Sequence, residues 1–395
     1  MLAHAVEDAS AVDRLPSHAG VVVIGGGIVG ASVAFHLAEA GVRDVVLVER
    51  DGLAGGSSGK PIGGVRGQFS DALNIQLAAR SLDAYARFGS RPGADIELDR
   101  VGYLFLLRTP AAVERFATGI ALQNELGIPT RLLSPAEARG RCPYVDAEPL
   151  LAAAFSPSDG HARPMIAAAA YVRAARRHGA RAVTGCSVTG IDVEGDEITA
   201  VHTSRESVRT SIVVCAAGAW SEEIGAMAGV DLNVRPVRRQ IAFTGPLEPV
   251  VPSLPFTIDY DSTFYFHGAG DAVLLGMSDP DEAPGFERDY TEEWLPVLRG
   301  AAARCAPALA DVPLRDGWAG LYELTPDSNA LIGESPSIGR FLYATGFSGH
   351  GFCQAPAAGE VIRDLVRGEP PFVDVSPLRA ERFAERAHIL EANIV

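Results

Sequence analysis

The stretch VVVIGGGIVGASVAFHLAEAGVRDVVLVER, residues 21–50, decides the fold of this chain. Its first four residues are β-branched and apolar, as in a short strand that is buried on both faces. Gly25, Gly27 and Gly30 follow in the G-x-G-x-x-G spacing. Apolar residues then recur at helical intervals, and a second apolar run follows. The order of strand, glycine turn, helix and strand predicts a nucleotide-binding βαβ unit.

Each part of this unit has a chemical role. The first glycine permits the tight turn, the second lets a pyrophosphate approach the backbone, and the third lets the helix pack on the strand. The helix start, at Ile28 and Val29, offers N–H groups and a partial positive charge to the phosphates. The second strand, Val45 to Val48, ends at Glu49, where a carboxylate accepts hydrogen bonds from the adenosine ribose. We therefore predict a dinucleotide site.

Composition excludes several classes of function. The chain has 395 residues, of which 47% are hydrophobic and 21% charged, as in an ordinary enzyme with a sizeable core. Its net charge of −15 argues against nucleic acid or anionic membrane surfaces as partners. The five cysteines are far apart and form no C-x-x-C pair, so we expect buried reduced thiols, with neither a disulfide framework nor a metal site.

No targeting segment is expected. The first eighteen residues carry acidic side chains and lack an apolar core, so they predict a flexible tail and not a signal peptide. No apolar run approaches the length of a membrane helix. We therefore expect a cytoplasmic protein.

The chain beyond the βαβ unit predicts an α/β fold, α+β overall, with two interleaved domains. Residues 235–279 alternate polar and apolar side chains between regularly spaced turns, which is typical of an antiparallel sheet forming one wall of a substrate cavity. Ser134 with Glu137 three residues on predicts a capped helix start. We expect a Rossmann-like dinucleotide-binding domain over 19–95, 152–234 and 314–395, a substrate domain over 96–151 and 235–313, and a tail over 1–18. Helices are expected over 74–88, 111–126, 165–178, 294–309 and 355–365, and strands over 101–107, 181–188, 197–202, 210–215 and 341–345.

The C-terminal segment indicates which dinucleotide is bound. The predicted strand 341–345 runs into the glycine turn GFSGHGF, residues 346–352, and a helix follows. A second strand, turn and helix suits a cofactor that is longer than one nucleotide. The helix N-terminus can stabilise negative charge on the far ring system, which a reduced flavin carries and a nicotinamide does not. The glycine-rich stretch after Glu49 would then run along the cofactor.

The sequence here resembles the D-amino-acid-oxidase/sarcosine-oxidase superfamily of FAD-dependent oxidoreductases, and within it the sarcosine oxidase and sarcosine oxidase β-subunit branch. The matching stretches lie between about residues 20 and 370. They are VVVIGGGIVGASVAFHLAEAG, SSGKPIGGVRGQFS, CAAGAWS, AGLYELTPDSNALIG and ATGFSGHGF.

The resemblance implies an FAD site. Glu49 and Arg50 would meet the adenosine half, Ser57 and Ser58 the pyrophosphate, and residues 349–352 the flavin ring. The cofactor-binding residues implied or expected are Gly25, Gly27, Ile28, Val29, Gly30, Glu49, Arg50, Ser57, Ser58, Gly63, Gly64, Val65, Val188, Ala217, Gly218, Trp220, Gly346, Ser348, Gly349, His350, Gly351 and Phe352.

The resemblance also implies the reaction. Such enzymes oxidise the C–N bond of a small amine or amino acid, passing a hydride to flavin N5 and giving an imine that water hydrolyses. Oxygen or another acceptor then takes the electrons. Gly320 stands where some members carry a flavin-linking cysteine, and other members carry a histidine near Lys60. We therefore expect non-covalent FAD.

The substrate residues depart from the family pattern. The arginine that binds the substrate carboxylate falls on Arg66, but its lysine partner falls on Cys353, and an oxygen-activating lysine falls near Leu274. Arg66 is either a solvated surface charge or a bidentate partner for a carboxylate, and we favour the second.

Three further residues are candidates for the catalytic site. His350 is either a structural residue at the helix start or a polar contact to the flavin, and we favour the contact. Tyr322 and Tyr265 are either core aromatics or residues that line the pocket.

Two alternatives to an independent enzyme remain open. The chain could be a flavin-binding subunit or assembly factor of a larger complex, with a partner subunit and little activity alone. It could also be an NAD-linked dehydrogenase, which shares residues 25–49 but gives no account of the second glycine turn, so we rank it last.

Overall fold

The βαβ unit predicted from residues 21–50 forms as expected. The computed structural model describes residues 13–60, 62–146, 148–247, 253–385 and 390–393. Strand β1 (Val21–Ile24) leads through the glycine turn into helix α2 (Ile28–Glu39), and β2 (Val45–Val48) pairs with β1 in parallel. The local pattern of apolar residues is therefore sufficient to position the first glycine turn.

These strands belong to a six-stranded sheet in the order β18-β19-β12-β1-β2-β8. All neighbours run parallel except β18, which is antiparallel to β19. The remaining strands are β8 (Arg181–Val183), β12 (Val213–Cys215), β18 (Leu331–Glu334) and β19 (Phe341–Thr345). The C-terminal part of the chain thus completes the sheet that the N-terminal part begins, as in the predicted Rossmann-like domain.

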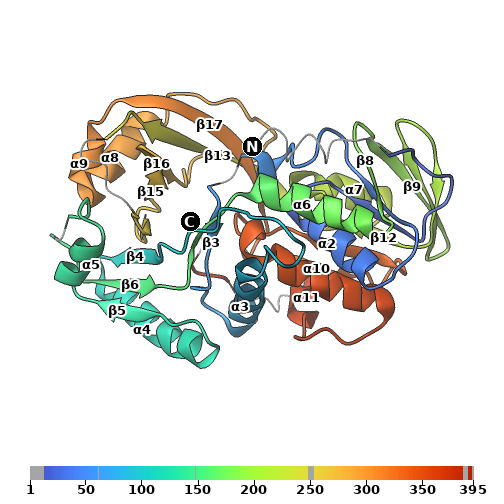
Figure 1. The fold of residues 1–395 in the computed structure, drawn as a ribbon, viewed down its shortest axis with the longest axis horizontal. Coiled ribbons are helices and arrows are strands. Elements are labelled where there is room, and N and C mark those ends of the chain that lie inside the picture. The colour runs from blue at the N-terminus through green and yellow to red at the C-terminus, as the bar shows by residue number, and fades with distance from the viewer. Residues whose placement is uncertain (1–12, 61, 147, 248–252, 386–389, 394–395) are drawn as a thin grey trace.

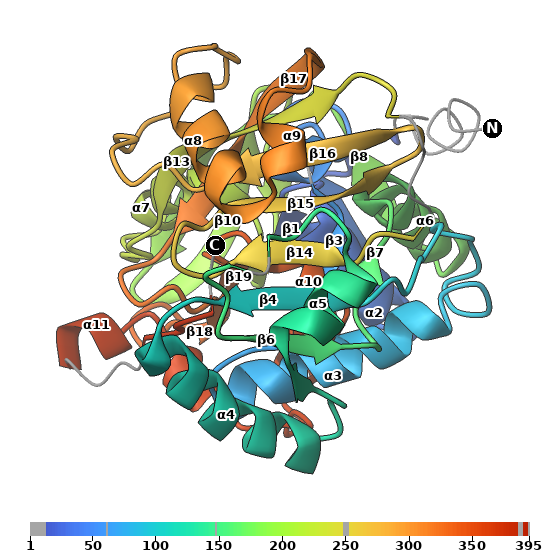
Figure 2. The same ribbon diagram turned by 90° about the vertical axis from the view of Figure 1, so that its left-hand side faces the viewer.

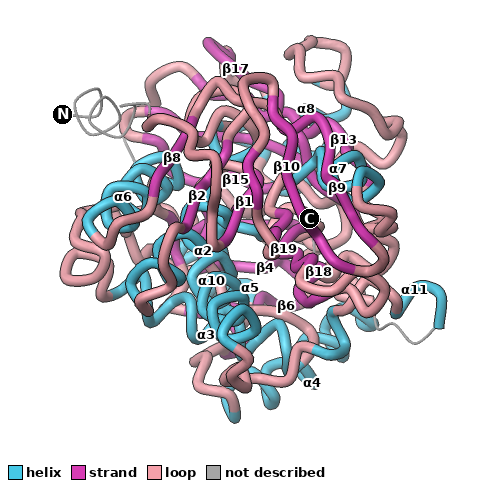
Figure 3. The backbone as a smooth tube through the Cα atoms, turned by 90° about the vertical axis from the view of Figure 1, so that its right-hand side faces the viewer, coloured by secondary structure: helices cyan, strands magenta, loops and turns pink. Residues whose placement is uncertain are grey.

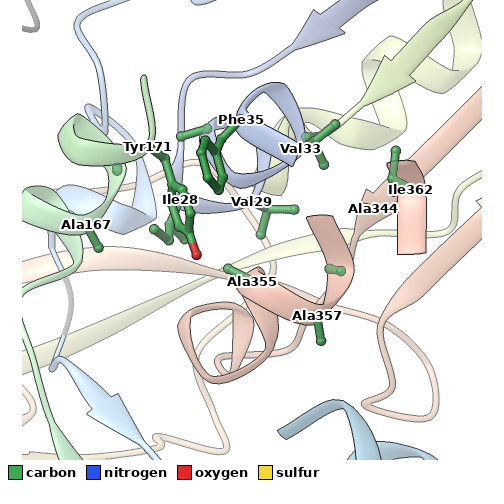
Figure 4. Packing of buried hydrophobic residues seen from close by; sticks show 14 of the residues in the cluster. Ile28, Val29, Val33, Phe35, Ala167, Tyr171, Ala344, Ala355, Ala357 and Ile362 are labelled. Atoms are coloured by element: carbon green, nitrogen blue, oxygen red, sulfur yellow. The ribbon is translucent and has the colours of Figure 1, made fainter. Parts of the chain in front are cut away.

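Both faces of this sheet are covered, because every residue of β1 and β2 is apolar. Val21 and Val23 pack against one layer of helices, and Val22 and Ile24 pack on the other face against a small antiparallel sheet. Figure 4 shows α2 packing against its neighbours through residues such as Val33, Phe35, Tyr171 and Ile362, and in Figure 3 α2, α3 and α10 lie together beside the strands. The helices of this layer are α3 (Ala72–Ala86), α6 (Pro164–Arg177) and α10 (Gly351–Arg367); the opposite layer contains β9 (Val188–Glu194), β10 (Glu197–Thr203), β11 (Val208–Arg209) and α7 (Ser221–Met227).

The second sheet has eight strands in the order β17-β13-β16-β15-β14-β4-β6-β5. It is antiparallel, as predicted, except that β14 and β4 run parallel. Figures 1 and 2 show it beside the first domain, with α4, α5, α8 and α9 around it. Its strands are β4 (Tyr103–Leu107), β5 (Arg131–Leu133), β6 (Ala152–Ser156), β13 (Arg235–Thr244), β14 (Phe256–Asp259), β15 (Tyr265–Ala269), β16 (Ala272–Met277) and β17 (Leu314–Leu324).

The remaining elements are short or peripheral. A two-stranded ladder, β3 (Gly64–Val65) with β7 (Gly160–His161), lies where the chain passes between the domains. The capped start predicted at Ser134 is confirmed, because Ser134 and Glu137 form a capping box. The other helices are α4 (Pro110–Glu125), α5 (Pro135–Arg141), α8 (Leu295–Cys305), α9 (Pro307–Ala310) and α11 (Arg382–Glu385), and short 3-10 turns span Ser57–Gly59, Gly218–Trp220 and Ser376–Leu378.

The structure differs from the expected domain boundaries at two strands. Strand β6 pairs with β4 and β5, and β17 pairs along its length with β13, so residues 152–156 and 314–324 lie in the second sheet. We had expected both in the dinucleotide-binding domain. Residues 152–156 are apolar and residues 314–324 mix apolar with charged side chains, so composition assigns neither segment to a sheet, and pairing with distant strands decides.

Three predicted elements also have different limits. The strand expected over 181–188 divides into β8 and the start of β9, with Gly185 at φ +60° between them. The helix expected over 294–309 is interrupted at Ala306, so Pro307 begins α9. The helix expected from residue 355 begins at Gly351, directly after the glycine turn.

The expected flexible tail is attached where the structure describes it. Residues 1–12 lie outside the described residues. Asp13 accepts a hydrogen bond from the Ala182 N–H at 2.8 Å and pairs with Arg176 at 2.9 Å, and Leu15 is buried. Residues 13–18 are therefore fixed against β8, and the prediction of a flexible tail is wrong for them.

Candidate functional site

A cavity lies between the two sheets and joins the parts of the chain that the sequence singled out. Its walls come from the first glycine turn, the loop around residues 57–66, the start of α10, and the cavity face of β13, β15 and β17. Most of the predicted cofactor residues line it. Gly30, Val65 and Gly346 do not, because they pack into the surrounding structure.

The glycine turn leaves no space for side chains where it is most closely packed. Gly25 has φ +114°, and a Cβ there would meet the carbonyl of Ala216. A Cβ on Gly30 would meet the carbonyl of Gly25, so the third glycine allows α2 to pack on the turn, as predicted. The turn thus has the shape of a phosphate cradle.

Glu49 is held in place at the end of β2. Its two carboxylate oxygens accept hydrogen bonds from the N–H groups of Gly26 at 2.6 Å and Asp51 at 2.8 Å. Glu49 also lines the cavity. A carboxylate fixed at this point suits the ribose contact that the sequence predicts.

The two serines of the glycine-rich loop have different partners. The Oγ atom of Ser58 accepts a hydrogen bond from the Ile28 N–H at 2.9 Å, at the start of α2. Ser57 donates to the carbonyl of Leu321 at 2.7 Å, which joins the loop to β17. Both line the cavity beside the helix N-terminus, where a pyrophosphate would be stabilised.

Arg50 and Trp220 line the end of the cavity where the adenosine half of the cofactor is expected. The guanidinium carbon of Arg50 lies 4.2 Å from the ring centroid of Trp220, and Phe286 stacks on Trp220 at 5.6 Å. Val188, Ala217 and Gly218 line the same end of the cavity. Trp220 therefore lies in the wall where packing against the adenosine half was expected.

The second glycine turn brings His350 to the cavity. His350 precedes the first residue of α10, is 3% exposed, and has no hydrogen-bond partner for either ring nitrogen within the described part of the chain. Burial, and then the positive charge of Arg66, lower its pKa to about 3, so the ring is neutral near pH 7. A neutral imidazole with unpaired nitrogens is suited to a polar contact with a bound ring.

Arg66 is not a surface charge. It is 5% exposed and its guanidinium carbon lies 4.1 Å from the ring centroid of Phe69. Nη1 donates to the carbonyl of Gln68 at 2.6 Å and Nη2 to that of Asn393 at 2.5 Å. The surface alternative is therefore wrong, while the carboxylate role stays a prediction for a side chain that lines the cavity and already meets two main-chain carbonyls.

Both candidate tyrosines line the cavity. Tyr265 also packs into the core of the second sheet, so its two interpretations are both correct. The ring of Tyr322 stands on Gly349, which has φ +96° and room for no side chain. Enclosure raises the pKa of both phenols above the ordinary value, so both are protonated near pH 7.

The positions that departed from the family pattern also have clear surroundings. A Cβ on Gly320 would meet the side chain of Lys60, so the two positions that could attach a flavin lie side by side. Cys353 is buried, donates to the carbonyl of Gly64 at 3.4 Å, and has a raised pKa because of burial. Leu274 is buried in the core of the second sheet. All five cysteines are buried and free, as predicted.

Glu323 and Arg239 are among the cavity residues that were missed from the sequence. Glu323 of β17 faces the second glycine turn, and its enclosure raises its pKa to about 7. Arg239 of β13 projects into the cavity. The alternation of residues 237, 239 and 241 along a predicted strand could have placed Arg239 on the same face as Ile241.

The surroundings as a whole fit FAD. One cavity joins a phosphate cradle, a fixed carboxylate and a second helix start at a distance from the first. Within the described residues, no group of histidine, cysteine and acidic side chains is arranged to hold a metal ion. No helix in the described ranges is long and apolar enough to span a membrane.

Comparison with known proteins agrees with this geometry. A 4-methylaminobutanoate oxidase (formaldehyde-forming) from Paenarthrobacter nicotinovorans is 29% identical to this chain, and the match covers 95% of this chain and 47% of the oxidase. Mouse mitochondrial dimethylglycine dehydrogenase is also 29% identical, and the match covers 91% of this chain and 44% of the dehydrogenase. The chain thus spans about half the length of these curated relatives. The crystal structure of L-proline dehydrogenase from P. horikoshii is 33% identical, covers 95% of this chain and 100% of that one, and superposes with a TM-score of 0.88. Glycine oxidase from Geobacillus kaustophilus is 25% identical over 93% of this chain and 99% of its own, with a TM-score of 0.82.

The family assignment rests on a match along most of the chain. The profile of the DAO family, described as FAD dependent oxidoreductase, matches residues 20–365. Together with the two glycine turns around one cavity, this match shows that the chain belongs to the DAO family of FAD-dependent oxidoreductases.

Proposed function

We propose that this protein is an FAD-dependent dehydrogenase or oxidase that oxidises the C–N bond of a small amine or amino acid. The observation that carries the proposal is the single cavity that joins the phosphate cradle at Gly25 and Gly27 to the polar wall of His350, Tyr322 and Tyr265. A site that held only a nucleotide would have no use for this second, polar end.

Bound FAD would supply the hydride acceptor for oxidation at the carbon beside the amine, and water would hydrolyse the resulting imine. The residues of the chain would hold the reactants in place for this transfer. The start of α2 and Ser58 would meet the pyrophosphate, and Glu49 the ribose. No described group is needed as a nucleophile.

The polar wall would orient the amine. His350, Tyr265 and Tyr322 are all uncharged near pH 7, because enclosure lowers the pKa of the histidine and raises the pKa of the phenols. These neutral groups, together with the cations Arg66 and Arg239 in the same cavity, favour the neutral amine over the ammonium form, and the neutral amine has the lone pair that is needed to form the imine.

Reconstitution with FAD followed by anaerobic titration with amines tests the proposal. The protein should bind FAD, and a suitable amine should bleach the flavin absorbance without oxygen. A protein that takes up no FAD would overturn the proposal. An NAD-linked activity without bound flavin would also overturn it.

A second candidate is a flavin-binding subunit that works with a partner. It is favoured by Cys353 and Leu274, which stand buried and uncharged where the family pattern places lysines. Copurification with a partner, together with bound flavin that no amine in a broad panel bleaches, would select this function over the first.

A further inference from the structure

Arg239 is a second arginine that lines the cavity, besides Arg66. It lies on β13, where it is directly paired with Gly320 of β17. Because side chains alternate along a strand, Arg239 shares its face with Ile241, and both line the cavity. Gly320 also lines the cavity, and the side chain of Lys60 packs against it.

Arg238, the preceding residue of β13, differs from Arg239 in its partners. Arg238 points to the other face, where it pairs with Glu282 at 3.1 Å and donates to the carbonyl of Asp289 at 2.9 Å. Arg239 has no ion pair with any described acidic residue. Its Nη1 donates to the carbonyls of Arg238 at 3.0 Å and Asp279 at 3.4 Å, and its Nε is buried without a partner in the described chain.

An unpaired, desolvated guanidinium N–H is costly unless a bound molecule supplies an acceptor. The Nε and Nη2 edge of an arginine matches the two oxygens of a carboxylate. The hydrogen bonds of Arg239 to described residues involve Nη1 alone, so this edge is left for a ligand. In Arg66 both terminal nitrogens already donate to main-chain carbonyls.

The tyrosines place Arg239 at the reactive end of the cavity. Its guanidinium carbon lies 5.5 Å from the ring centroid of Tyr322. Enclosure raises the pKa of Tyr322, and the charges of Arg239 and then Arg66 oppose this rise. Enclosure also raises the pKa of Tyr265, where Arg239 is the opposing cation.

We propose that Arg239 is the residue that binds the acidic group of the substrate, and that the substrate is an amine bearing a carboxylate. Arg66 then joins its own loop to the segment 390–393 through the carbonyl of Asn393, and its positive charge acts on the substrate only from a distance. This inference rests on the proposed function, because it assigns a specificity residue to the same site.

Binding of carboxylates that cannot be oxidised tests the inference apart from turnover. The flavin-loaded protein is titrated with acetate, methoxyacetate and benzoate, and with the corresponding uncharged amides, and binding is followed by the flavin difference spectrum and by calorimetry. The wild-type protein should bind at least one carboxylate about tenfold or more tightly than its amide. Equal binding of acids and amides would overturn the inference.

Four variants then assign the anchor. Arg239→Ala should weaken carboxylate binding by about tenfold or more and leave amide binding unchanged, and Arg239→Lys should recover part of the loss because an ammonium makes no two-pronged contact. Arg238→Ala, the matched control on the opposite face, should bind carboxylates within about twofold of wild type. Arg66→Ala should weaken binding less than Arg239→Ala.

The opposite ranking, with the loss at Arg66 and none at Arg239, would overturn the inference and return the anchor to Arg66. Absence of flavin in the wild-type protein would instead contradict the proposed function, and flavin content is therefore measured first. With an oxidisable amino acid, Arg239→Ala should raise KM about tenfold or more while kcat stays within severalfold, as expected for lost binding that is shared by ground and transition states.

Discussion

Arg66 donates a hydrogen bond of 2.5 Å to the main-chain carbonyl of Asn393, across 327 positions of sequence. The contact ties the loop of the cofactor cavity to the segment 390–393. Glu391 strengthens the junction, because its carboxylate accepts from the Ser70 N–H at 3.1 Å and from Asn74 Nδ2 at 3.1 Å. The segment 390–393 is thus attached to Arg66, a residue that lines the cavity.

Removing the guanidinium of Arg66 should loosen the attachment of the segment 390–393. In Arg66→Ala, the carbonyl of Asn393 loses a charged donor in a buried place, which is worth about 1.5–3 kcal/mol. We expect faster amide hydrogen exchange over residues 390–393, measured by mass spectrometry, with bound FAD retained. Arg87→Ala, in an exposed pair, should leave the exchange of this segment unchanged. Unchanged exchange in both variants would show that the contact does not hold the segment.

The flavin should be released when the protein is denatured. Gly320 offers no nucleophile, and the side chain of Lys60 fills the space beside it. After acid precipitation, flavin absorbance should be found in the supernatant. Flavin fluorescence that stays with the protein band on a denaturing gel would contradict this expectation.

Gly349→Ala should damage the site through the backbone and through Tyr322 together. Gly349 has φ +96°, and a Cβ would meet the Tyr322 ring. The strained backbone alone costs about 1–3 kcal/mol, so thermal unfolding should occur at a lower temperature and amine-dependent bleaching should slow. Gly140→Ala is the matched control. Gly140 lies in α5 with open space around its Cβ position, so this change should stabilise the chain by up to about 1 kcal/mol. A Gly349→Ala protein as stable as wild type would refute the role of this glycine.

Asp159 should make stability depend on pH. It is fully buried, and burial raises its pKa from 3.8 to about 7. The folded chain therefore binds more protons at this residue between about pH 4 and pH 7, and its contribution to the free energy of unfolding falls as pH rises through this window. Asp159→Asn removes the effect. The unfolding free energy of the variant minus that of wild type, measured by denaturant titration, should rise with pH by at most about 4 kcal/mol. The exposed Asp83→Asn control should show no such slope, and a flat difference for Asp159→Asn would refute the raised pKa.

An artificial dye should reoxidise the flavin faster than oxygen does. The resemblance to the family predicts an oxygen-activating lysine near Leu274, and Leu274 is buried in the apolar core of the second sheet. Without a cation at that position, the negative charge that develops on oxygen has one stabilising group fewer. Stopped-flow reoxidation of the reduced protein measures both rates. A faster reaction with oxygen would show that another group supplies the charge.

Much of the fold could be predicted because the patterns that specify it are local. The apolar run before Gly25, the helical repeat after it and the second strand up to Glu49 each involve neighbouring residues, and β1, α2 and β2 form as predicted. The capping box at Ser134 and Glu137 spans one helical turn and was predicted for the same reason. The cofactor class followed from two such local units, whose glycine turns line one cavity.

What only the tertiary structure decided is how distant segments meet. The composition of strands β6 and β17 assigns neither to a sheet, and their hydrogen bonds to β4, β5 and β13 decide their place. The sequence alone predicted a flavin site and singled out Arg66 as a site residue. No local pattern, however, indicates that Nη2 of Arg66 donates to the carbonyl of Asn393. Arg239 likewise became a candidate only once β13 paired with β17 and placed its unpartnered Nε at the cavity. Hydrophobic periodicity specifies which elements form, whereas the partners of a buried polar group depend on contacts between segments far apart in the chain.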